Sequence, residues 1–211
     1  MSSACSELTV SGLEAAPVGR FLDDLASAAP TPGGGAAVGL TGALAAALVA
    51  MVCRLTARRE PLAPGLLEAA SRADELRRRL AHLTTDDAAA YDEVLGARRA
   101  NDPSAAEAAL ARATDVPLAV ARSAGDVLAL VGEVAPAARA SALADLGVAL
   151  ALAEAALNGA VITARANLVE MADAARARAA GAEIDGLVAQ GQARRHRAAE
   201  AIAQRSERPR P

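Results

Sequence analysis

The sequence predicts an all-α fold, a bundle of about six to seven long helices. Of its 211 residues, 53% are hydrophobic but only 1% are aromatic, and alanine supplies much of the apolar fraction. Alanine favours helix and buries little area per residue, so helices rich in it must pack closely, and a second subunit often completes such a core. No useful length of chain alternates with period two, so no sheet is expected. We therefore expect a helical bundle whose core favours contact with a second subunit.

Each expected helix is bounded by residues that start or stop helices. We expect helices over residues 18–28, 35–58, 64–100, 104–131, 137–180 and 182–204. Asn101 and Asp102 are typical of a stop followed by a cap, and Pro117 favours a bend in the fourth helix. Asn158-Gly159 either breaks or only bends the fifth helix, and Gly181 separates the last two. The sequence thus predicts a single helical domain over residues 18–204, between an irregular arm (1–17) and a frayed tail (205–211).

Composition and charge argue against several classes of partner. The formal net charge is −3 and aromatic side chains are nearly absent, whereas nucleic-acid binding needs a concentrated basic surface and bases to stack on aromatic rings. Cys5 and Cys53 lie far apart in the sequence and belong to no metal-spaced cluster, so no metal site is expected.

The apolar run 36–53 is nearly long enough to span a bilayer. Its residues are mostly alanine and glycine, and it carries no aromatic belt. We therefore expect a buried central helix rather than a membrane span. The first residues show no signal-peptide pattern, which favours a cytoplasmic location.

The loop Pro30-Thr31-Pro32-Gly33-Gly34-Gly35 is the most informative segment, because it comes directly before that apolar run. The prolines keep the chain extended, and the three glycines let the backbone approach a ligand closely. The first N–H groups of the following helix have no partner within the helix and can bind an anion or a carbonyl oxygen. The alternative is a glycine-rich connection between two packed helices.

One candidate catalytic residue lies on the third expected helix. Leu76, Leu80, Leu83, Asp87 and Tyr91 follow one another at spacings of three or four, so they share one face. Asp87 is therefore expected to point into the interior, where a carboxylate is costly unless it is paired or used. The alternative is a structural Asp that forms a hydrogen bond to a neighbouring helix.

A second carboxylate stands in the fifth expected helix. Asp145 is the sole charge between residues 140 and 153, and every face of that segment is apolar apart from Ser141. We expect Asp145 to be buried near Asp87, since two carboxylates on neighbouring helices favour a pocket that receives a cation or activates water. Asn167 lies further along the same helix and is a candidate for binding a polar ligand.

Arg58 and Arg59 follow the second expected helix. Cations at this position stabilise the helix dipole. The alternative is a site for the acidic tail of a ligand.

Several of these segments together resemble the cyclodeaminase/cyclohydrolase family, which includes the methenyltetrahydrofolate cyclohydrolases. The resemblance is carried by residues 21–35 with PTPGGG, 42–52, the block DDAAAYDEV at 86–94, 144–149 and 158–168, and it extends over about residues 18–200. It implies an all-helical homodimer that binds folate and hydrolyses 5,10-methenyltetrahydrofolate to 10-formyltetrahydrofolate without a cofactor.

The resemblance also implies roles for the candidate residues. Asp87 is expected to be the general base, and Asp145 to position the substrate or share a proton. Substrate contacts are expected from Thr31, Pro32, Gly33, Gly34, Gly35, Arg58, Arg59, Tyr91 and Asn167.

Two alternatives stay open at this point. One is formiminotetrahydrofolate cyclodeaminase activity, which releases ammonia. The other is a non-catalytic folate-binding helical dimer, because Ala36, Ala144 and Thr163 stand where polar residues are usual in the family.

Overall fold

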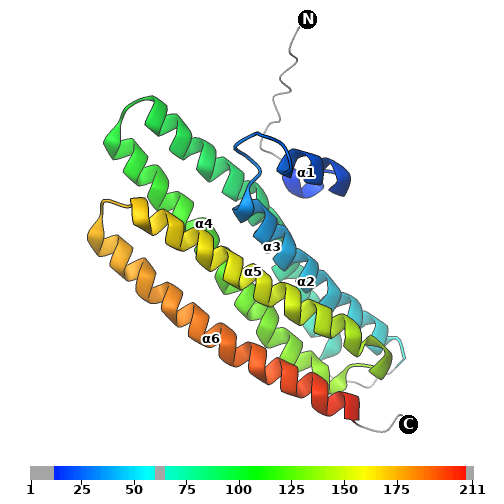
Figure 1. Ribbon diagram of the computed structural model, residues 1–211. Helices are drawn as coiled ribbons and strands as arrows, with labels where there is room; N and C mark the ends of the chain where they lie inside the picture. Colours follow the sequence, from blue (N-terminus) through cyan, green and yellow to red (C-terminus); the bar gives the residue numbers. More distant parts are fainter. Residues whose placement is uncertain (1–11, 60–64, 208–211) are drawn as a thin grey trace, which may run out of the picture.

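The computed structural model describes residues 12–59 and 65–207 and confirms an all-α fold: these residues contain six α-helices and no strand (Figure 1). The helices are α1 (Val18–Leu25), α2 (Gly34–Ala57), α3 (Leu66–Arg99), α4 (Pro103–Val134), α5 (Leu143–Glu170) and α6 (Ala174–Glu207). Short 3-10 turns occur at Leu13–Ala15, Ala135–Ala137 and Ala140–Ala142.

The long helices α2 to α5 form a four-helix bundle. Each packs against the next, and α5 closes the ring against α2. The sixth helix packs along α4 and α5 (Figure 1), and the 3-10 turn Leu13–Ala15 that precedes α1 packs on α3. One consequence is that, among the described residues, no other helix covers the outer sides of α2 and α5 that face away from α6.

The core depends on close contact between helices that carry small residues. A Cβ added at Gly39 would lie 2.8 Å from Thr84 Oγ1, and one added at Gly42 would lie 3.0 Å from Leu80 Cδ2. These glycines therefore allow α2 to approach α3 closely, which compensates for the small area that each alanine buries. The bundle interior is filled mainly by aliphatic side chains such as Leu80, which is fully buried.

The connection between α5 and α6 differs from the predicted one. The fifth helix continues through Gly159, and Gly181 lies inside α6. The chain instead turns at residues 171–173, where the Asp173 carboxylate accepts two backbone N–H groups of the first turn of α6. The Glu107 carboxylate of α4 accepts two further hydrogen bonds, from the backbone N–H groups of Ala172 and Asp173 in the connection. An Asp that caps a helix start is a stronger boundary signal than a lone glycine.

The two predicted termini are only partly described. Residues 205–207 continue α6, so the prediction of a frayed tail from residue 205 is wrong for these three. Residues 1–11 of the predicted arm and residues 208–211 lie outside the described residues, as does residue 64, the predicted first residue of the third helix.

Two of the described helices are long and apolar enough to cross a membrane by length and composition, α2 and the segment Ala140–Glu170. Of these apolar stretches, 56% and 44% are buried inside the bundle. The outward remainder forms two exposed apolar stripes on neighbouring helices, which we call the α2/α5 apolar stripes. They consist of Leu44, Met51 and Leu55 on α2 and Val148 and Ile162 on α5.

Candidate active site

A cavity of about 370 Å³ opens at the end of the bundle where α2 begins. One wall is the α3 face formed by Asp87, Tyr91, Val94 and Arg98, which recur at spacings of three or four. Residues of α4 and α5 form the facing wall, and the Pro/Gly loop closes the end next to Asp87. The cavity therefore has a half-buried acid, Asp87, at one end and an ion pair at the other.

The glycine loop allows the Asp87 carboxylate to reach the first turn of α2. A Cβ added at Gly35 would lie 1.9 Å from Asp87 Oδ1, so no side chain fits at this position without a shift. The backbone N–H of Ala36 donates a hydrogen bond to this carboxylate. Asp87 thus occupies the anion-binding position of a helix N-terminus, although it belongs to a different helix.

Burial decides the protonation behaviour of Asp87. Removal from water raises the pKa of Asp87 from its ordinary value of 3.8 to about 6, while the hydrogen bond from the Ala36 N–H lowers it in part. Burial wins because a desolvated carboxylate is disfavoured in its charged form. A carboxylate with this pKa is ionised near neutral pH yet is a stronger base than an exposed Asp, which suits general base chemistry.

Asn167 has a structural role that depends on a proline far away in the sequence. Pro117 lies inside α4 and has no N–H, so it cannot form the helix bond to the carbonyl of Ala113. The Asn167 Nδ2 donates to that carbonyl over 3.0 Å. Asn167 therefore holds α5 against α4 at the cavity wall, and its side-chain Oδ1 is the atom that remains to accept from a ligand.

The structure brings most of the predicted site residues together. Thr31, the three glycines, Asp87, Tyr91 and Asn167 all line this cavity. Pro32 is buried and is not among the lining residues.

Asp145 does not line this cavity, so the prediction that Asp145 and Asp87 of one chain lie close together is wrong. It stands in the first turn of α5 and is half-buried. Thr163, which lines the cavity, is 18 residues further on, about 27 Å along the helix axis. The prediction failed because an apolar helix surface need not be buried in its own chain: Ala144 and Val148 beside Asp145 are exposed.

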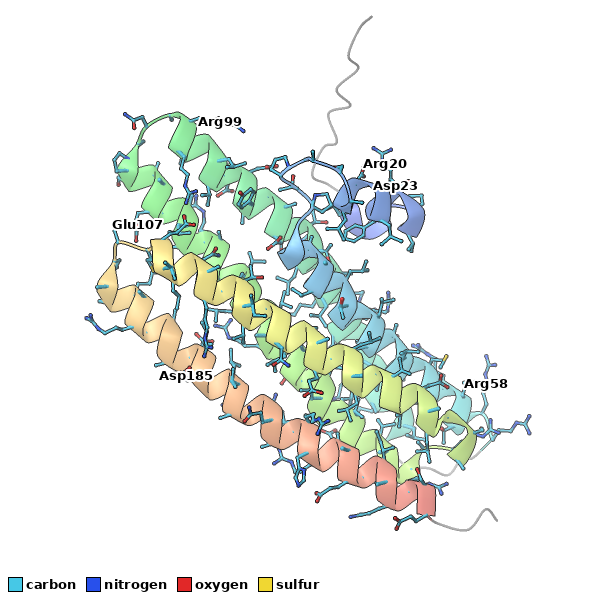
Figure 2. All side chains as sticks on the ribbon, in the orientation of Figure 1. Arg20, Asp23, Arg58, Arg99, Glu107 and Asp185 are labelled. Carbon is cyan, nitrogen blue, oxygen red and sulfur yellow. The ribbon has the colours of Figure 1, made fainter. Side chains whose placement is uncertain are left out.

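Arg58 and Arg59 also lie far from the cavity. They are exposed at the end of α2, about 34 Å along the helix from Gly35. Figure 2 shows Arg58 at the end of the bundle opposite α1, on which Arg20 and Asp23 are labelled. In this chain they cannot contact a ligand that Asp87 contacts.

The sequence prediction missed an ion pair at the outer end of the cavity, where Arg98 of α3 contacts Glu170 of α5. The signal for Arg98 was present, since it continues the stripe through Asp87, Tyr91 and Val94 by one more helical turn. On α5, Glu170 follows Asn167 by three residues and so lies on the same face of that helix.

A model of the formiminotransferase-cyclodeaminase family matches residues 17–186. The chain belongs to the formiminotransferase-cyclodeaminase family. Among similar members, a methenyltetrahydrofolate cyclohydrolase of Methylorubrum extorquens is 38% identical over 194 residues, covering 86% of this chain and 93% of that protein.

A crystal structure of formiminotetrahydrofolate cyclodeaminase from Thermotoga maritima matches the fold of this family member with a TM-score of 0.86 and 26% identity. The match covers 92% of this chain and 98% of the other. The family membership predicted from the sequence is therefore confirmed, and the bundle is the fold of a solved relative.

Proposed function

We propose that this protein hydrolyses the cyclic amidinium of 5,10-methenyltetrahydrofolate to give 10-formyltetrahydrofolate. The observation that carries the proposal is the half-buried Asp87, placed against the glycine-walled start of α2 in a cavity of about 370 Å³. The substrate carries a positive charge spread over N5, the bridging carbon and N10, and an ionised carboxylate stabilises that charge. The 38% identical cyclohydrolase supports this choice of substrate.

The reaction requires a base and then an acid, and Asp87 can supply both in turn. Its carboxylate takes a proton from water while the water oxygen bonds to the bridging carbon, which gives a neutral hydroxyl adduct. The bond from this carbon to N5 then breaks, N5 takes the proton from Asp87, and the hydroxyl proton leaves to solvent. The sum is addition of one water and release of one proton, with no metal or redox cofactor required.

The remaining cavity residues suit the rest of a folate. The loop at Thr31 and Gly33–Gly35 offers backbone groups for the pterin at the Asp87 end. Tyr91, the one tyrosine of the sequence, lies a helical turn away on the same α3 face. We expect this ring to contact the p-aminobenzoyl group, because aromatic rings pair favourably in offset contacts. Asn167 Oδ1 is an acceptor for a substrate N–H.

Cyclodeamination of 5-formiminotetrahydrofolate is the second candidate. It is favoured by the raised pKa of Asp87, since a carboxyl group with a pKa of about 6 can also protonate a departing nitrogen. The solved cyclodeaminase of the same fold supports it, at 26% identity.

One pair of assays separates the candidates. The loss of methenyl absorbance is followed with purified protein under saturating substrate, and ammonia release is followed with 5-formiminotetrahydrofolate. We expect the first rate to exceed that of buffer and to disappear in Asp87→Asn. A methenyl rate no faster than buffer together with ammonia release would assign the second activity, and folate binding without either turnover would indicate a non-catalytic binder.

We also propose that the protein is a cytoplasmic homodimer that associates through the α2/α5 apolar stripes. Leu44 and Val148 on these stripes are 52% and 51% exposed, and α2 carries no charged residue between Gly34 and Cys53. A symmetric pairing of these surfaces would remove the stripes from water, as expected for a homodimer interface. Light scattering coupled to gel filtration measures the mass, and a monomer at micromolar concentration would contradict this proposal.

A further inference from the structure

We propose that Arg98 is a carboxylate subsite that binds the glutamate tail of the folate. This inference rests on the proposed function and identifies which group recognises the acidic end of the substrate. It replaces the predicted role of Arg58 and Arg59, which follow the last residue of α2, at the end away from the glycine loop.

The geometry of α3 places Arg98 at the correct end of the cavity. Asp87, Tyr91, Val94 and Arg98 lie along one face, and Arg98 is eleven residues after Asp87, about 16 Å along the axis. Side chains on a helix lean toward its N-terminus, which directs the guanidinium back toward the cavity. A folate with its one-carbon bridge at Asp87 continues through a benzoyl ring into one amino acid, a length of the same order.

Charge singles out Arg98 for this role. Among the described residues that line the cavity, Arg98 is the one cationic side chain, whereas Asp87 and Glu170 are acidic. A glutamate tail carries two carboxylates and would be repelled by a cavity that offered acids alone. Arginine presents a planar fork of N–H groups that matches a carboxylate, so a guanidinium at this end supplies both charge and geometry.

The ion pair with Glu170 leaves Arg98 available to a ligand. The hydrogen bond to Glu170 engages Nη2 of a guanidinium that has five N–H donors. Both side chains are about half exposed, at 47% and 56%, and such exposed pairs contribute little to stability. Glu170 therefore holds the guanidinium across the mouth between α3 and α5, and a substrate carboxylate can share it or displace Glu170 at small cost.

The test compares two substrates that differ only in the tail. The variant Arg98→Met removes the charge and keeps the length of the side chain. Steady-state kinetics are measured with 5,10-methenyltetrahydrofolate and with 5,10-methenyltetrahydropteroate, which lacks the glutamate. We expect KM for the complete substrate to rise about tenfold, as for loss of one charge-assisted hydrogen bond, with kcat changed by less than about twofold. KM for the truncated compound should stay the same.

The matched control is Arg99→Met, since Arg99 is the adjacent exposed arginine and does not line the cavity. It should leave both KM values unchanged, and Arg98→Lys should restore part of the loss because it keeps the charge. An equal change for both substrates, or no change for the complete one, overturns the proposal. If Arg98→Met does not fold, the comparison of Arg98→Lys with wild type on the two substrates decides the question in the same way.

Failure of the proposed function gives a different result. In that case the wild-type protein turns over neither compound, and calorimetric titration with tetrahydrofolate and tetrahydropteroate replaces the kinetics. Arg98→Met should then weaken binding of tetrahydrofolate alone, by about tenfold. Equal affinity of the variant and the wild type for tetrahydrofolate would overturn the Arg98 subsite.

Discussion

Replacing Asp87 with asparagine should abolish activity and at the same time stabilise the protein at neutral pH. The carboxylate is the proposed base, and loss of a general base slows a reaction by about a hundredfold or more. Burial raises the pKa of Asp87 from 3.8 to about 6, so the folded state disfavours the ionised carboxyl. Asparagine keeps the shape and can still accept the Ala36 N–H, but it carries no charge.

The size of the stability effect follows from the two pKa values. At pH values between the unfolded-state pKa of 3.8 and the folded-state pKa of about 6, the folded state binds more protons than the unfolded state. The free energy of unfolding of the wild type therefore falls as pH rises from about 4 to about 6. The full difference of about two pKa units corresponds to about 3 kcal/mol. The part of this loss in the unfolding free energy of the wild type that falls between about pH 4.5 and pH 8 is about 2 kcal/mol. Any constant effect of asparagine on packing cancels in this comparison between pH values.

The assay is urea denaturation of the wild type and Asp87→Asn at both pH values, at one fixed protein concentration. The free energy of unfolding of Asp87→Asn, relative to that of the wild type, should increase by about 2 kcal/mol from about pH 4.5 to pH 8. Gly34→Ala is the control, because it adds a methyl group in open space and changes no titratable group; its stability difference from the wild type should be the same at both pH values. A stability difference for Asp87→Asn that is the same at both pH values would refute the reasoning about burial.

Three further predictions concern the walls of the site and the interface. Gly35→Ala should lower the free energy of unfolding by about 2 kcal/mol and remove activity, because its Cβ would lie 1.9 Å from a carboxylate oxygen; Gly34→Ala, with no atom within 4 Å, should leave the melting temperature unchanged. Asn167→Ala should cost about 1 kcal/mol in urea denaturation, and much less in a Pro117→Ala background, where α4 regains the missing N–H; equal costs in both would contradict the hydrogen-bond argument. Leu44→Asp should give a monomer in gel filtration with light scattering, and an unchanged dimer would exclude the α2 stripe as the interface.

The part of the site that could be predicted is the part that depends on local periodicity. Asp87 and Tyr91 share a helix face by spacing alone, and the Pro/Gly loop precedes a helix start, so both could be placed without coordinates. The raised pKa of Asp87 could be expected from its apolar neighbours. Its contact with Gly35 could not, since it depends on how closely α2 and α3 pack.

The errors have a common physical origin in contacts between distant segments. Asp145 was expected to be buried because its helix is apolar on nearly all faces, but the helices that the structure describes leave one side of α5 uncovered. Arg58 was expected to contact the same ligand as the glycine loop from the family resemblance, although the length of α2 separates them. The bond from Asn167 to the carbonyl of Ala113, which Pro117 leaves without a helix partner, joins positions 54 residues apart. No local pattern reports such a contact.

The pH dependence of kcat/KM for methenyltetrahydrofolate, after subtraction of the buffer rate, tests most directly whether the half-buried Asp87 carboxylate drives hydration. The value should be level above an apparent pKa of about 6 and should decrease about tenfold per pH unit below it, as expected when one ionised group is required. A profile that stays level from about pH 7 down to about pH 4.5 would mean that no group with the raised pKa of Asp87 takes part in the reaction.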